Sequence, residues 1–165
     1  MQTSAAIALQ MKEVYEGGNW SEVDLAATLA DITWAEANII TPVSANSIAA
    51  ILIHLQFYNN VVKDRLAGIN TAIPDTNGFD VPKMKNAADW KLLQQNSFAS
   101  ALALMDVVSA LPDEKLFEVL TSSGVTVYKT LHGVVEHAYY HLGQIVMLKK
   151  IIRTKLRIEE RNNSL

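Results

Sequence analysis

The segment NSIAAILIHLQFYNNVVKDRLAG, residues 46–68, decides the fold class of this chain. It begins with Asn46, a good helix-capping residue, and it ends at Gly68, a good helix stop. At 1.5 Å per residue, a helix of this length spans about 34 Å. Apolar residues recur through it at helical spacing, and His54 lies inside that apolar stripe. The segment predicts a long amphipathic helix that packs against others.

Three further long helices are predicted from the same kind of pattern, over about residues 2–16, 87–111 and 126–156. Glycines follow the first of these helices, and Pro112 ends the second. Four long amphipathic helices with little strand pattern predict an all-α fold, a four-helix bundle with long crossover connections. Because no repeat or domain boundary is visible, residues 1–165 are expected to form a single domain. The alternative is a mixed α+β domain that uses residues 116–127 as strands.

The connections between the long helices also have recognisable signals. Ser21 is expected to cap a short helix that runs through Leu29, and a further turn is expected at residues 34–38. Residues 69–85 are rich in Gly, Pro, Asn and Asp, and they predict a long crossover loop. Loops of that length often carry function.

Composition and charge exclude several classes of function. Half of the residues are apolar, 19% are charged and the net charge is −3, which is typical of a globular protein without pull toward nucleic acid or anionic lipid. No apolar run reaches ~18 residues, so no membrane span is expected. The absence of cysteine excludes disulfides and thiolate ligands. Because the start of the chain does not resemble a signal peptide, a cytoplasmic protein is expected.

Cationic residues gather near the end of the chain. Six of them fall between residues 149 and 161: Lys149, Lys150, Arg153, Lys155, Arg157 and Arg161. The favourable interaction of cations with a helix C-terminus is the preferred explanation, and contact with nucleic acid is the alternative.

Two histidines, His137 and His141, lie four residues apart in VVEHAYYHLGQI, residues 134–145. A helix turns about 100° per residue, so these side chains are about 40° apart on one face. The rest of that face is mostly apolar, and we expect both imidazoles to point into the bundle. His132 lies about 140° away from them and is expected to face outward.

His54 is also expected on an inward, mainly apolar face. A buried imidazole needs partners for both of its nitrogens. One divalent cation would satisfy one nitrogen of each of the three rings and leave the other for a hydrogen-bond acceptor. This requires the helices over residues 46–68 and 126–156 to be neighbours. Spacing alone leaves open whether the three histidines bind metal or are hydrogen-bonded core residues.

Three features together resemble a known family: the histidine inside residues 46–68, the motif HAYYHLGQI, and VYEGGNWSEVDLAATLADITWAEA between the first two long helices. The chain is similar to the DinB-like superfamily of metal-binding four-helix bundles, which includes YfiT-like proteins and bacillithiol S-transferases. The resemblance covers nearly the whole chain. It implies that His54, His137 and His141 ligate a divalent transition metal, commonly nickel, zinc or manganese, with open positions held by water.

The resemblance also implies a range of functions. Three imidazoles with open positions suit a metal-dependent enzyme, of the thiol S-transferase or hydrolase type. The partner would be a small-molecule substrate, with a low-molecular-weight thiol as the cosubstrate because the chain has no cysteine. Tyr58 and Gln144 are the expected helpers: Tyr58 to orient substrate, and Gln144 to bond a ligand or bound water.

Two alternatives remain open from the sequence. One is a non-enzymatic metal-binding or interaction bundle, which is supported by the absence of an obvious acid or base near the histidines. Another is that Tyr58 and Gln144 only fill the core. The three tryptophans are expected to anchor core contacts, with one at a dimer surface as the alternative, and a homodimer is a further expectation.

Overall fold

The computed structural model describes residues 2–81, 84–121 and 124–163. Its elements are the helices α1 (Thr3–Glu16), α2 (Leu25–Leu29), α3 (Trp34–Ala37), α4 (Ile48–Leu66), α5 (Ala87–Ser109) and α6 (Val127–Asn162), and the 3-10 helix η1 (Asp113–Phe117). Over these described ranges there is no strand, only isolated bridges such as the one between Val119 and Thr126. The all-α prediction is confirmed, and the α+β alternative is wrong.

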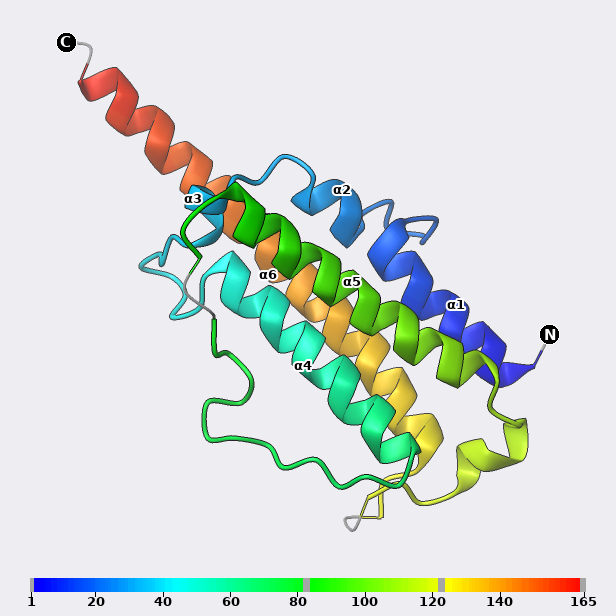
Figure 1. Ribbon diagram of the computed structural model, residues 1–165. Coiled ribbons are helices and arrows are strands. Elements are labelled where there is room, and N and C mark those ends of the chain that lie inside the picture. Colours follow the sequence, from blue (N-terminus) through cyan, green and yellow to red (C-terminus); the bar gives the residue numbers. More distant parts are fainter. Residues whose placement is uncertain (1, 82–83, 122–123, 164–165) are drawn as a thin grey trace.

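Helices α1, α4, α5 and α6 form the bundle, with α1 and α6 running one way and α4 and α5 the other (Figure 1). Each of α4 and α1 packs against both α5 and α6. Because α4 and α5 are parallel neighbours, the chain must cross the length of the bundle between them. The expected neighbourhood of the second and fourth long helices is therefore present, as α4 against α6.

Two of the predicted caps are displaced by one or a few residues. Ser47, and not Asn46, caps α4 by accepting a hydrogen bond from a backbone N–H of its first turn. Asp24, and not Ser21, caps α2 in the same way, because Ser21 donates instead to the side chain of Asn19. Helix α6 continues six residues beyond the predicted end, to Asn162.

The tryptophans do not all anchor the core. Trp90 is buried, and its indole N–H donates to the Ile32 carbonyl at 2.8 Å. Trp20 is fully exposed and Trp34 is 37% exposed, so the core prediction is wrong for Trp20. Both lie in the segment between α1 and α4, where helical periodicity is too short to fix which side faces inward.

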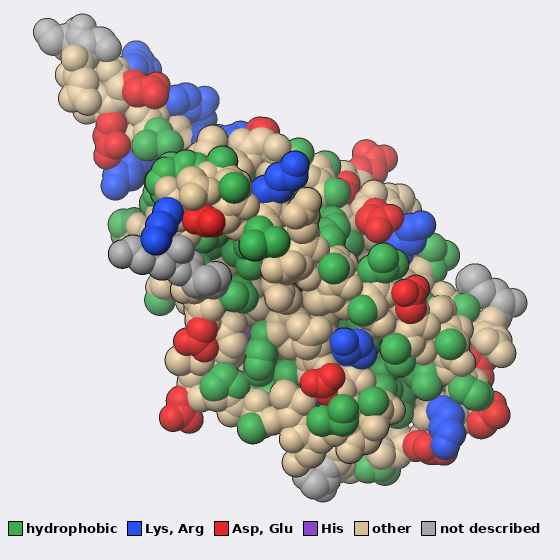
Figure 2. Space-filling view, in the orientation of Figure 1, with side chains coloured by type: hydrophobic (Ala, Val, Ile, Leu, Met, Phe, Trp, Pro, Cys, Tyr) green, Lys and Arg blue, Asp and Glu red, His purple; other side chains and the backbone are tan. Residues whose placement is uncertain are grey.

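The C-terminal end of α6 projects beyond the other helices and carries many of the Lys and Arg side chains (Figures 1 and 2). Closer to the bundle, Lys149 and Arg153 bind Asp31 at 2.5 and 2.7 Å, and Arg153 also binds Glu36 at 2.8 Å. These two cations therefore tie α6 to the α2–α3 segment, which the helix-dipole explanation did not anticipate. None of the described helices combines the length and apolarity needed to cross a membrane.

The crossover between α4 and α5 runs back along the outer side of α4 (Figure 1). Within it, Asn77 and Gly78 both have positive φ, 53° and 75°. Gly78 passes so close to α4 that a Cβ there would lie 2.4 Å from Cδ1 of Phe57. The turn therefore needs a glycine at this position, and the close approach places the residues around it against the histidine of α4.

Candidate metal centre

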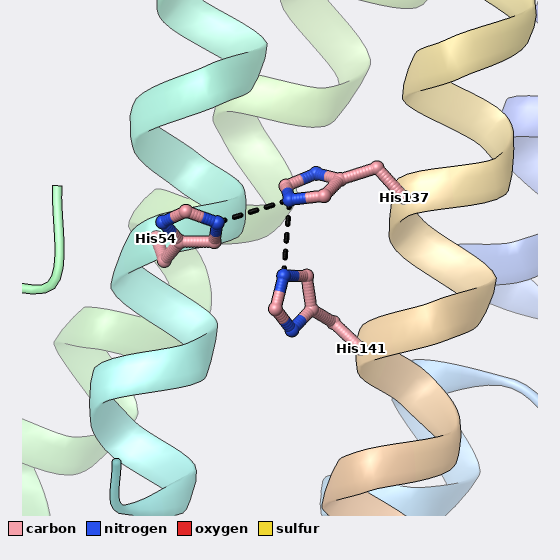
Figure 3. A group of neighbouring side chains, drawn as sticks. All are labelled: His54, His137 and His141. Carbon is pink, nitrogen blue, oxygen red and sulfur yellow. Dashed lines mark hydrogen bonds between the residues drawn. The ribbon is translucent and has the colours of Figure 1, made fainter. Parts of the chain in front are cut away.

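The bundle brings three histidines from two helices to one point (Figure 3). His54 comes from the middle of α4, and His137 and His141 come from successive turns of α6. The Nε2 atom of His137 lies 2.9 Å from Nε2 of His54 and 3.0 Å from Nε2 of His141. One ring nitrogen from each residue thus faces a common centre, and these atoms all lie within 4.8 Å of one another.

The outer nitrogens of two rings have hydrogen-bond acceptors. Nδ1 of His54 lies 2.7 Å from the backbone carbonyl of Asn77, and Nδ1 of His141 lies 2.7 Å from Oε1 of Gln144. Both acceptors require a proton on Nδ1, since an oxygen of this kind can only accept from the ring. In the neutral tautomer, Nε2 of His54 and Nε2 of His141 therefore carry lone pairs directed at the centre.

With this protonation pattern, the centre has too few N–H donors for the ring nitrogens that face it. His137 can place at most one proton on its Nε2, which serves only one of the two neighbouring lone pairs. At least one of these lone pairs then faces the centre without a hydrogen-bond donor. A divalent cation removes this deficit, because each Nε2 becomes a ligand while Asn77 and Gln144 hold the outer N–H groups. The donor set therefore fits a metal ion.

Burial keeps these rings uncharged, as metal ligands must be. His54 and His141 are buried and His137 is half-buried. Burial lowers the pKa of His137 to about 4, with a smaller contribution from the neighbouring His141 and His54 rings. Burial also lowers the pKa of His54 and of His141, against the opposing effect of their hydrogen bonds to Asn77 and Gln144. All three rings are neutral near pH 7 and ready to ligate.

Aromatic side chains surround the centre. The Phe79 ring stacks on the His54 ring, with centroids 3.9 Å apart and planes 6° apart. Tyr58 lies one turn after His54, and its ring meets the edges of the His54 and His137 rings at 4.9 and 5.2 Å. Its hydroxyl donates to Oδ1 of Asn77 at 2.5 Å. Tyr58 is therefore close to the histidines, but its proton is already engaged.

A cleft of about 370 Å³ opens beside the histidines, along the seam between α4 and α6. Its lining is formed by His54, Tyr58, Val62, Arg65, Asn77, Thr130, Gly133, Val134 and His137. A larger hollow of about 590 Å³ lies elsewhere, between α2 and the basic end of α6. The smaller cleft is the one next to the candidate metal ligands, and it gives a small molecule access to them.

A comparison with known protein families finds that residues 18–145 match the DinB superfamily. The chain belongs to the DinB superfamily. The match covers more than half of the 165 residues and includes all three histidines of the centre. No curated protein and no solved structure matches the chain. The three-histidine group fits a metal-binding protein of DinB type.

In this DinB-superfamily chain, the structure brings together every residue that the sequence singled out for the site. The side-chain oxygen of Gln144 lies 2.7 Å from Nδ1 of His141, and Tyr58 lines the cleft. His132 lies apart from the group, half-buried against Tyr128 with ring centroids 4.4 Å apart.

Three residues of the centre and its cleft were missed from the sequence: Asn77 and Phe79 beside His54, and Arg65 in the lining of the cleft. Asn77 and Phe79 lie in the crossover loop of the DinB-superfamily fold, whose path no periodicity reveals. The pair Asn77-Gly78 is a turn signal, which marks a tight bend but not what it touches. Arg65 resembles any cation in the last turn of a helix.

Proposed function

We propose that the protein is a metal-dependent enzyme of the thiol S-transferase or hydrolase type, with His54, His137 and His141 as ligands of one divalent transition metal. The observation that carries the proposal is the convergence of three Nε2 atoms beside an open cleft. Three protein ligands with space for a further one are typical of catalytic rather than structural sites.

The donor set narrows the identity of the metal. Three neutral imidazoles without thiolate or carboxylate suit borderline ions such as zinc and nickel, and manganese is the harder alternative known for the superfamily. When bound, such an ion would lower the pKa of a water or thiol in its open position and polarise an electrophile beside it.

The surrounding residues have distinct parts in this proposal. The Asn77 carbonyl and Gln144 fix the ring orientations of His54 and His141. Phe79 covers one face of His54 and keeps water from that side. Tyr58 is placed to contact a molecule in the cleft with its ring, while its hydroxyl is held by Asn77.

The lining of the cleft favours thiol transfer over hydrolysis. None of its described residues is an aspartate or glutamate, and Glu136 is exposed. Hydrolysis commonly uses a carboxylate to take a proton from water, whereas a thiol loses its proton more readily and needs less help. Because the chain has no cysteine, the thiol would be a small cosubstrate.

The same lack of a carboxylate supports a second candidate function, a metal-binding bundle without catalysis. A site of three histidines and no acid or base could serve binding or sensing alone. The two candidates differ in one observable property, which is turnover that depends on the metal.

The test combines metal analysis with turnover. Protein purified without a histidine tag is expected to bind about one divalent metal per chain. Glutathione, cysteine and 2-mercaptoethanol are then each offered with 1-chloro-2,4-dinitrobenzene. In this reaction a carbon–sulfur bond forms, the carbon–chlorine bond breaks, chloride leaves and the thiol proton passes to solvent.

Turnover that is abolished by a chelator and by His137→Ala, but kept in His132→Ala, supports the transferase. Chelator-sensitive hydrolysis of p-nitrophenyl acetate with the same variant pattern supports the hydrolase. One metal per chain without turnover in either assay supports the binding protein, and absence of metal binding refutes both enzymes.

A further inference from the structure

We propose that the cleft beside the histidines binds an elongated small molecule with an oxyanion at one end, a carboxylate or a phosphate, and that Arg65 pairs with this oxyanion. The aliphatic body of the molecule would lie along the seam between α4 and α6. This deepens the proposed function, because it names a class of substrate. It rests on the proposed function only for the reaction of the bound molecule at the histidines.

Arg65 is the one cationic residue in the lining of the cleft. It is half-buried, and over the described parts of the chain its guanidinium has no ion pair or hydrogen bond. Two cations of α6, Lys149 and Arg153, are by contrast engaged with Asp31. An unpaired guanidinium in a concave site is a strong recognition element for an oxyanion, since its planar fork matches two oxygens at once.

Two hydroxyls along the cleft are already engaged within the chain. The hydroxyl of Tyr58 donates to Asn77, and the hydroxyl of Thr130 donates to the backbone carbonyl of Thr126 at 3.0 Å. The rest of the wall between the two ends is apolar and includes Val62 and Val134. Selection for a charged end therefore depends on Arg65, and the middle of the cleft favours an aliphatic chain.

Gly133, on the opposite helix α6, also supports a binding site in the cleft. It lies within α6, where a glycine costs about 1 kcal/mol of helix stability relative to alanine. Packing does not require it, because a Cβ at this position would meet no atom within 4 Å, and its φ is not in the left-handed region. Gly133 lines the cleft. A side chain here would project into open space beside the cleft, so the glycine leaves room for a bound molecule.

The separation of the two ends sets the shape of the ligand. His54 and Arg65 are eleven residues apart on α4, which corresponds to about 16 Å of axial rise. The arginine side chain spans part of this distance. The remainder suits a chain of several carbons between the oxyanion and the group that reaches the histidines.

The first test uses metal-free protein and calorimetric titration with linear alkyl carboxylates of six to twelve carbons. Alcohols of equal length serve as uncharged probes, and alkyl phosphates serve as the second oxyanion. At least about tenfold tighter binding of the oxyanions than of the alcohols is expected, the size typical of a charge-assisted hydrogen bond. Whichever of the two classes, carboxylates or phosphates, binds more tightly is the class of ligand that the site prefers.

Arg65→Gln is expected to remove this preference. Lys63→Gln is the matched control, because Lys63 is the other cation in the last turn of α4, is also half-buried and does not line the cleft. The control distinguishes oxyanion recognition from a general effect of charge at the helix end.

Gly133→Leu is expected to weaken binding of the oxyanions and the alcohols alike by at least tenfold. Gly143→Leu is its control: Gly143 is exposed on α6, and a Cβ there also meets nothing within 4 Å. If Gly133→Leu does not fold, Gly133→Ala provides the same test with a smaller obstruction in a more stable helix.

Equal binding of carboxylates, phosphates and alcohols, no binding of any probe, or equal losses in Arg65→Gln and Lys63→Gln would overturn the proposal. The metal content of the protein as purified, measured before the metal is removed for the titrations, separates its failure from that of the proposed function. Protein that holds metal but shows no oxyanion preference refutes the inference alone. Protein that prefers oxyanions through Arg65 but holds no metal supports the inference and refutes the metal-dependent enzyme.

Discussion

At the residue scale, two acceptors outside the histidine group determine the protonation inside it. The Asn77 carbonyl and the Gln144 amide oxygen each hold an N–H group of a different ring. A neutral imidazole has one N–H donor and one acceptor nitrogen, and in an ordinary core each of these nitrogens would have its own hydrogen-bond partner. Here the outer positions take the protons of His54 and His141, and their lone pairs face the centre with at most one donor between them. This arrangement is unfavourable without a cation and favourable with one.

His137→Ala removes the Nε2 atom that lies nearest to both other histidines. We expect the variant to lose its divalent metal, from about one ion per chain to none, because two imidazoles bind far more weakly than three. His132→Ala removes a histidine of the same helix outside the group and should keep the metal. Elemental analysis of untagged protein measures both. Equal metal content in the two variants would refute the assignment of His137.

Gln144→Leu tests the acceptor behind His141. The substitution removes the oxygen that holds the Nδ1 proton, and the imidazole loses both its orientation and its preferred tautomer. Changes of this kind weaken metal binding by about 10–100-fold. Competition titration with a chromophoric chelator measures the affinity. The exposed Gln95→Leu on α5 is the control, and a loss of the same size there would show that Gln144 has no special part.

At the scale of elements, the helices and the loop differ in how far the sequence predicts them. The apolar period placed the ends of the four long helices within two residues, except for the C-terminal end of α6, since burial of an apolar stripe is a property of each segment alone. The contacts of the crossover loop could not be predicted. Phe79 stacks on His54 and Asn77 bonds it because the loop folds back along α4, and this path depends on the whole bundle.

Gly78→Ala tests the dependence of the site on the loop. An alanine at φ 75° is strained, and its Cβ would meet Phe57 so closely, at 2.9 Å even from the Phe57 Cβ, that rotating the ring gives no relief. We expect the free energy of unfolding to fall by about 2 kcal/mol or more. We also expect metal affinity to fall about tenfold, because Asn77 moves with the turn.

Gly68→Ala is the control for this substitution. Its φ of 79° carries the same backbone strain, but its Cβ would meet nothing within 4 Å. Gly68→Ala should lower the free energy of unfolding, measured in urea, by about 1 kcal/mol and leave metal affinity unchanged. If both variants kept full metal affinity, the loop would not support the site.

Asp31→Asn tests the ion pairs that tie α6 to the α2–α3 segment. Hydrogen bonds from Arg153 and Lys149 lower the pKa of Asp31 from 3.8 to about 2. Its folded pKa is lower than its unfolded pKa, so its contribution to stability is present above pH 3.8 and is lost as the pH falls toward 2. In urea unfolding of metal-free protein, the free energy of unfolding of wild type should exceed that of Asp31→Asn above pH 3.8. This difference should shrink as the pH falls from 3.8 toward 2.

The exposed Asp75→Asn, which removes a carboxylate outside these ion pairs, serves as the control for Asp31→Asn. Asp31 is exposed, and solvent screening keeps its effect small. A difference between wild type and Asp31→Asn that stays constant from pH 5 to pH 2 would contradict the role of the ion pair.

At the scale of the whole molecule, the order of the bundle creates the site. The pair His137 and His141 could be predicted from spacing within one helix. His54 joins them only because α4 and α6 are neighbours, which the spacing could not decide and the family resemblance implied. Arg65 could not be predicted as part of the cleft, because a lone cation near a helix end has the same pattern whether it faces solvent or a binding site.

The most direct test of the central claim, that α4 and α6 together hold one metal ion, is anomalous diffraction from crystals of untagged protein grown with cobalt. We predict one strong anomalous peak per chain, about 2.1 Å from the Nε2 atoms of His54, His137 and His141. The absence of a peak between these three atoms, or a peak bound to other residues only, would contradict the claim.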